Sequence, residues 1–100
     1  MQQTTVERKL PFAAVFREPN KGDPKWYVEI PNINGVFSSG ETLAEAKENI
    51  RIALRNHSQD KPLSIYEVIQ MDSMEHMWNS GYQGYQVHIL TEVVFVSEPV

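Results

Sequence analysis

The sequence predicts an α+β fold: a single two-layer domain with elements in the order β-β-β-α-(α)-β. Three observations lead to this prediction: an apolar alternating segment followed by a dense turn cluster, one amphipathic segment that begins with a capping box, and a strongly apolar final segment. One hundred residues, 41% hydrophobic and 22% charged, suffice for one modest core. We therefore expect one domain over residues 1–100, with an ordered core over about 9–97.

The first two strands are expected to form an antiparallel hairpin. In Leu10–Arg17, both alternating sets of side chains are largely apolar, which is typical of a strand covered on both faces. Pro19–Pro24 is rich in turn-forming residues, and Lys25–Ile30 follows it as the second strand. Alternation divides this strand into one face with Trp26, Val28 and Ile30 and another with Tyr27 and Glu29.

A second turn and a short third strand come next. Pro31–Gly35 contains the turn-forming residues, and Val36–Ser39 is the expected strand. Gly40 closes this section, either at a strand end or at a bend that needs an unusual backbone angle.

The helix has the clearest local signal. The Thr42 hydroxyl can accept a hydrogen bond from the Glu45 amide, which is the geometry of a capping box. We expect a helix from about Leu43 to His57 that ends before Pro62. Its apolar stripe consists of Leu43, Ala46, Ile50, Ala53 or Leu54, and His57.

Residues 63–80 carry two conflicting signals. Ser64–Glu67 reads as another capping box, and three methionines follow at a spacing of three, namely Met71, Met74 and Met77. Ile65, Val68 and Ile69 also fit a strand, so residues 64–71 stay open between helix and strand. We favour a helix here, broken or irregular near Asp72 and Ser73, followed by a loop formed by Asn79–Gly81 and Gly84.

The last segment, Tyr85–Val96, predicts a strong strand. One face has Val87, Ile89, Thr91, Val93 and Phe95, and the other has His88, Leu90, Val94 and Val96. As a bare edge, the run Val93–Val96 would promote aggregation. We therefore expect this strand to be covered in a homo-oligomer or paired centrally.

Charge is distributed unevenly along the chain. All nine Lys and Arg lie between Arg8 and Lys61, whereas residues 62–100 contain five acids and no Lys or Arg. Affinity for nucleic acid comes largely from basic side chains on phosphates, so we expect no direct nucleic-acid binding. The net charge of −4 favours a basic protein as the partner.

Other classes are excluded by what the sequence lacks. It contains no cysteine, hence no disulfide and no thiolate metal site. It also has no secretion signal and no run of about 20 apolar residues, so we expect a soluble, cytoplasmic protein without membrane contact.

Two stretches, Trp26–Gly35 and Gly40–Ala46, resemble the HicB family of antitoxins. The resemblance rests on an aromatic strand, a Pro-containing turn with Gly, and a Gly-Glu-Thr helix entry. The motif residues are Trp26, Pro31, Gly35, Gly40, Thr42 and Ala46. The similarity is good over residues 26–54 and loose over 10–96, and it does not include the family's usual C-terminal DNA-binding domain.

The resemblance implies a partial ribonuclease-H-like fold and a partner. That partner would be a small basic toxin with a double-stranded-RNA-binding type of fold, which degrades messenger RNA and whose active site the antitoxin covers. For such a role, the candidate partner-binding residues are Glu29, Glu41, Glu45, Glu48, Met74 and Trp78. The simplest role of the three glutamates near the helix start is capping and complementation of the helix dipole, and the favoured role of the Met and Trp side chains is to fill the core or cap the sheet.

No catalytic or metal constellation is evident. The predicted first strand has no Asp or Glu, which a two-metal nuclease would need. The three histidines, His57, His76 and His88, match no compact ligand spacing. We therefore expect no enzymatic activity, no metal and no cofactor.

The leading hypothesis is thus a non-enzymatic, antitoxin-like protein that binds and occludes a small basic mRNA-degrading toxin. The alternative is a solitary HicB-like module without a cognate toxin, which serves oligomeric interaction or ligand binding. Divalent-metal-dependent RNA cleavage by the pure protein would favour a third interpretation, an enzyme.

Overall fold

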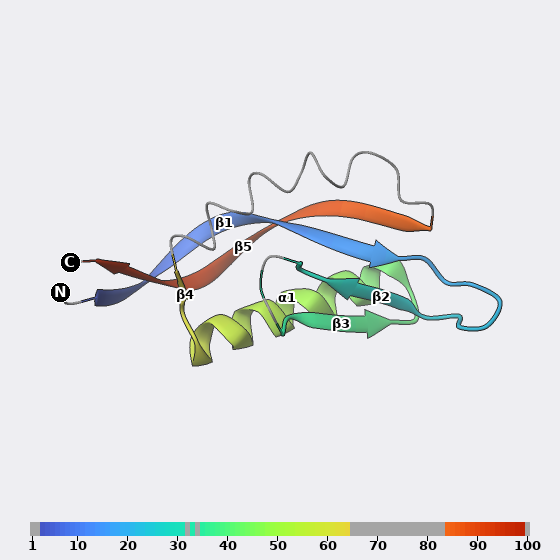
Figure 1. The fold of residues 1–100 in the computed structure, drawn as a ribbon, viewed down its shortest axis with the longest axis horizontal. Coiled ribbons are helices and arrows are strands. Elements are labelled where there is room, and N and C mark those ends of the chain that lie inside the picture. The colour runs from blue at the N-terminus through green and yellow to red at the C-terminus, as the bar shows by residue number, and fades with distance from the viewer. Residues whose placement is uncertain (1–2, 32, 34, 65–83, 100) are drawn as a thin grey trace.

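The computed structural model describes residues 3–31, 33, 35–64 and 84–99. These residues form one five-stranded sheet, in the strand order β3-β2-β1-β5-β4, with one helix packed against it (Figure 1). The elements are β1 Gln3–Arg17, β2 Trp26–Glu29, β3 Phe37–Gly40, α1 Leu43–Asp60, β4 Leu63–Ser64 and β5 Tyr85–Pro99. The predicted α+β class is confirmed.

β1 and β5 form one long antiparallel ribbon. Their pairing is unbroken from Gln3 opposite Pro99 to Arg17 opposite Tyr85. In Figure 1 the two strands extend together beyond the rest of the sheet, with both chain ends at the same side. β1 therefore starts well before the predicted Leu10, because its polar first part is held in strand conformation by β5.

β5 is paired on both sides. β1 lies along one side, and β4 adds parallel pairs at Val96 and Ser97 on the other. Central pairing is thus how the structure covers the apolar end of β5. β4 lies at the start of the segment that stayed open between helix and strand. Ser64 was favoured as a helix cap, but it belongs to this strand. The rest of the expected helix, with its methionines and Trp78, lies outside the described residues.

The predicted hairpin between β1 and β2 is confirmed. Val15 lies opposite Glu29, and Arg17 lies opposite Tyr27. Asn20 holds the connecting turn, because its Oδ1 accepts from the backbone N–H groups of Gly22 and Asp23 at 2.9 Å each.

β3 runs one residue later than predicted, over Phe37–Gly40. The turn before it contains Gly35 at φ 91°, a left-handed conformation that glycine adopts without steric cost. Gly40 is the last strand residue and has no positive φ, so of the two expectations for Gly40 the strand end is confirmed.

α1 begins as the capping box predicts and ends three residues after His57. Thr42 Oγ1 accepts from Glu45 N at 3.0 Å. Its fully buried residues follow a stripe at intervals of four, namely Ala46, Ile50, Leu54 and Ser58. Ser58 was not predicted to be part of this stripe.

The core lies between α1 and the sheet. From β1, Phe12–Phe16 is buried throughout, as expected for a strand covered on both faces. Of the two faces expected for β5, the one with Leu90, Val94 and Val96 is the face that these buried side chains contribute to the core. The opposite surface of the sheet, called the outer face below, is turned toward the viewer in Figure 1, where α1 lies behind β2 and β3.

The helix is fixed to the sheet at both ends. Near its start, Asn49 Nδ2 donates to the backbone carbonyl of Ser39 at 2.8 Å. Near its end, Ser58 Oγ accepts from Phe95 N at 3.2 Å and donates to the Arg55 carbonyl at 2.9 Å. The Ser58 hydroxyl therefore satisfies a strand N–H and a helix carbonyl at the same time.

Candidate protein-binding site on the outer face

The strand register gathers side chains on the outer face. Val15, Glu29 and Phe37 lie in one row across β1, β2 and β3. In the next row, Arg17 lies between Tyr27 of β2 and Tyr85 of β5. Residues that are far apart in the sequence thus form one continuous surface.

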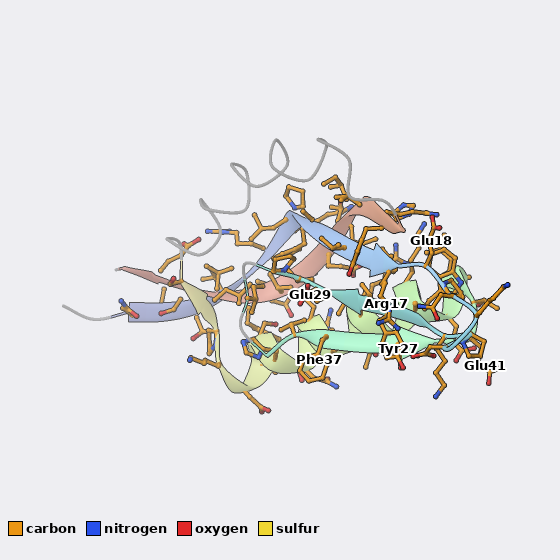
Figure 2. All side chains as sticks on the ribbon, turned by 45° about the vertical axis from the view of Figure 1, so that its right-hand side comes forward. Arg17, Glu18, Tyr27, Glu29, Phe37 and Glu41 are labelled. Atoms are coloured by element: carbon orange, nitrogen blue, oxygen red, sulfur yellow. The ribbon has the colours of Figure 1, made fainter. Side chains whose placement is uncertain are left out.

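This surface contains a hollow of about 210 Å³. Its lining is Val15, Arg17, Tyr27, Val28, Glu29, Phe37, Ser38 and Tyr85. Three of these residues are exposed aromatics: Phe37 is 71% exposed, Tyr85 44% and Tyr27 38%. Exposed aromatic side chains at this density are typical of protein-binding surfaces. Figure 2 labels Arg17, Tyr27, Glu29 and Phe37 over these strands.

A polar cluster holds one wall of the hollow in place. The Arg17 guanidinium lies 4.3 Å from the centre of the Tyr27 ring, and its Nη2 is 3.2 Å from Asp23 Oδ2. The Tyr27 hydroxyl donates to Asp23, and this bond, with the Lys25 backbone N–H and Arg17, lowers the pKa of the Asp23 carboxyl. The same bond raises the pKa of Tyr27. The orientation of the Tyr27 ring is therefore fixed before any partner binds.

Glu29 is the acidic group of the hollow. Its side chain is exposed, and none of the ion pairs in the described part of the chain involves it. Arg17, the cation of the hollow, already pairs with Asp23. The hollow thus presents one uncompensated carboxylate next to aromatic rings.

The predicted partner-binding residues do not form one group. Glu29 lies in the hollow, whereas Glu45 and Glu48 are exposed on α1, which packs against the opposite face of the sheet. Glu41 is exposed in the bend between β3 and α1, in view in Figure 2. The other two candidates, Met74 and Trp78, lie outside the described residues.

The remaining residues of this site were not predicted from the sequence. Tyr27 was placed on the face opposite Trp26, but its proximity to Phe37 and Tyr85 depends on the strand register. Strand alternation gives part of the signal for this site, because residues at alternating positions of paired strands share a face of the sheet.

The motif residues of the family resemblance all serve the fold. Thr42 caps α1, Ala46 is fully buried under Gly40, and Gly35 supplies the turn. Trp26 packs partly against the core, and the half-buried Pro31 follows Ile30 at the end of the β2 segment. None of the six lines the hollow.

The residues described here include no three His, Asp or Glu side chains placed to hold a metal ion. His88 instead packs edge-on against Phe16, with ring centroids 5.1 Å apart. Its Nε2 lies 3.0 Å from Gln86 Oε1, and Gln86 Nε2 donates to Glu18 at 2.8 Å. Partial burial lowers the pKa of His88, and the charge of Lys47 lowers it further.

We expect the fold to lose stability between pH 7.5 and pH 5 in part through His88. Because the His88 pKa is lower in the folded protein, the unfolded chain binds this proton more readily. The stabilisation from neutral His88 is therefore complete above the unfolded pKa of about 6.5 and is lost as pH falls through the folded value. Urea unfolding at the two pH values measures the loss. The loss should be smaller in His88→Gln, and an equal loss in both proteins would contradict this role.

The chain matches no protein-family model, no curated protein and no solved structure. Of the helices in the described residues, none has the length and apolar character needed to cross a membrane.

Proposed function

We propose that this chain is a non-enzymatic, antitoxin-like protein of the cytoplasm that binds a small basic ribonuclease toxin and blocks its access to RNA. The resemblance of residues 26–54 to HicB antitoxins supports this proposal. A further support is the outer-face hollow, which offers a surface for a protein partner.

The observation that carries the proposal is the position of Glu29. Its carboxylate is exposed and free of ion pairs among the described residues, and Phe37 lies directly opposite it on β3. A Lys or Arg side chain entering the hollow would pair with Glu29 while its methylene groups cover the aromatic rings. Such an inserted basic side chain is removed from RNA binding, which is the chemistry that occlusion of a ribonuclease requires.

The overall charge of the chain also favours a basic partner. The net charge of −4 attracts a basic protein over distances of about a Debye length, which is about 8 Å at physiological ionic strength. Complementary charge chiefly raises the association rate and disfavours wrong partners.

The test is capture of the small basic protein encoded in the adjacent reading frame. We expect the wild-type protein to co-purify with it and to restore growth when both are expressed. Glu29→Lys should weaken binding at least about tenfold, because it places a cation where the partner's cation docks. Isothermal titration at two salt concentrations measures this effect.

Glu41→Lys serves as the matched control, because it makes the same charge change at an exposed site outside the hollow. It should retain most of the affinity. If Glu41→Lys abolishes binding and Glu29→Lys does not, the hollow is not the contact. If no basic neighbour binds the wild-type protein, the proposed function is wrong.

A second candidate function is a solitary module that binds a small anionic ligand. It is favoured by Arg17 Nε, which is buried beside the hollow and has no hydrogen-bond partner among the described residues. Inorganic phosphate or acetate should then raise the melting temperature of the wild-type protein more than that of Arg17→Lys, whereas equal shifts would contradict this function.

A further inference from the structure

The outer edge of β3 is an unguarded strand edge. β3 stands first in the strand order and pairs with β2 alone among the described strands. Its four residues, Phe-Ser-Ser-Gly, include no charge and no proline. Natural edges are usually protected by charged residues, proline or bulges, so this edge is open to pairing with another strand.

The hydrogen-bond pattern shows which backbone groups this edge presents. Ile30 N donates to the Val36 carbonyl, so Val36 faces β2. In an antiparallel pair the direction alternates, and Phe37 and Ser39 therefore point away from β2. The Ser39 carbonyl is already taken by Asn49. Phe37 is thus the strand residue that offers both an N–H and a C=O on this side.

Exposed apolar side chains flank this edge on both faces of the sheet. Phe37, at 71% exposure, projects from the outer face. On the helix side, Ile52 is 50% exposed and follows Asn49 by one turn, on the same flank of α1. Two large apolar groups therefore lie along one edge, at either side of the backbone groups of Phe37.

The charges beside Ile52 are self-complementary. Glu48 precedes Ile52 by one turn, and Arg55 follows it by nearly one turn. Both are exposed, and the ion pair of Arg55 within the described part of the chain is a long one, of 3.8 Å to Glu7. If a second copy approaches with its helix antiparallel, Glu48 of each copy meets Arg55 of the other.

We propose that the β3 edge is the interface of a symmetric homodimer in which Phe37 pairs with Phe37 of a second copy. Each Phe37 N–H donates to the Phe37 carbonyl of the other copy, which is the closed exchange that a two-fold axis requires. The Ser39 carbonyl already accepts a hydrogen bond from Asn49. This disfavours a dimer register shifted by one residue, in which Phe37 of one copy would lie opposite Ser39 of the other. The two five-stranded sheets become one, and the two hollows, each lined by Phe37, lie side by side on one face.

Cysteine cross-linking tests the register directly, because the chain has no cysteine of its own. Directly opposed residues that exchange hydrogen bonds have Cα atoms about 5.5 Å apart, within the range of a disulfide. Phe37→Cys should therefore form a covalent dimer with mild oxidant or a short bis-maleimide. The matched control is Ile89→Cys, another exposed apolar position, on β5 away from this edge. Equal cross-linking at both positions, or none at residue 37, would overturn the proposal.

Charge exchange tests the helix contacts. By light scattering at about 100 µM, the wild-type protein should have the mass of two chains. Glu48→Arg and Arg55→Glu should each shift the population toward monomer by at least about tenfold in dissociation constant, and the double variant should restore the dimer. The proposed interface would be contradicted if the wild-type protein were a monomer, or if the two single variants left the dimer unchanged. The dimer does not depend on the proposed function, since Glu29→Lys should weaken toxin binding and leave the mass of the dimer unchanged.

Discussion

Gly40→Ala is expected to lower the free energy of unfolding by about 3 kcal/mol, at the upper end of overpacking costs. A Cβ at residue 40 would lie 2.5 Å from Ala46 N and 2.9 Å from Glu45 C. These are backbone atoms of the first turn of α1, so no side-chain rotation can relieve the clash. The helix start would have to move away from β3, and the contact of Ala46, which is fully buried, would be lost.

Chemical denaturation of the variant and the wild-type protein measures this loss. Gly22→Ala is the matched control, because its Cβ would meet only Asn20 Oδ1 at an ordinary 3.5 Å. We expect Gly22→Ala to stay within about 0.5 kcal/mol of wild type, as surface substitutions usually do. Equal effects of the two substitutions would show that the close approach of β3 and α1 is not needed for stability.

The second large effect is expected for Ser58→Ala, at about 2 kcal/mol. Ser58 is fully buried, and its hydroxyl is the acceptor for Phe95 N. Alanine removes that acceptor and leaves the strand N–H without its partner. The cost is then the desolvation of an unsatisfied donor, which exceeds the net value of an ordinary hydrogen bond.

Amide hydrogen exchange makes this prediction specific to one residue. In Ser58→Ala the amide of Phe95 should exchange faster relative to its neighbours, in addition to the global loss of stability. Asn56→Ala, an exposed change on the same helix, should be neutral or slightly stabilising because alanine favours helix. An unchanged Phe95 amide in Ser58→Ala would mean that the hydroxyl does not hold this strand.

The sequence predicted those elements whose signals are local. The hairpin follows from alternation on both sides of a turn cluster, and the turn is held by Asn20 as its residue type suggests. The start of α1 follows from Thr42, whose hydroxyl makes the predicted bond. In these places one short segment contains all the groups that form the structure.

The sequence did not predict features that depend on a distant partner. Residues 3–9 are polar except for Val6 and have no apolar face, and they form a strand because β5 pairs with them. β4 has two residues, too few for any periodicity, and it exists through its pairs with Val96 and Ser97. Ser58 was assigned to no apolar stripe because a serine gives no hydrophobic signal, although its hydroxyl meets a strand N–H.

The candidate site shows the same limit. Alternation placed Tyr27 and Glu29 on the face opposite Trp26 and Val28, which the structure confirms by the burial of Val28 and the exposure of Tyr27 and Glu29. The hollow also needs Phe37 and Tyr85, which reach it through the registers of β3 with β2 and of β5 with β1. A register is a property of strand pairs, and the single segments do not contain it.

The ribbon of β1 and β5 determines how the fold would respond to mechanical load. Gln3 and Pro99 are opposite each other at one end of fifteen consecutive antiparallel pairs. A tension applied between them would act on one pair at a time, in the manner of a zipper, and would not shear all pairs at once. We expect such pulling to peel the two strands apart gradually and at low force until the buried segment at Phe12–Phe16 is reached.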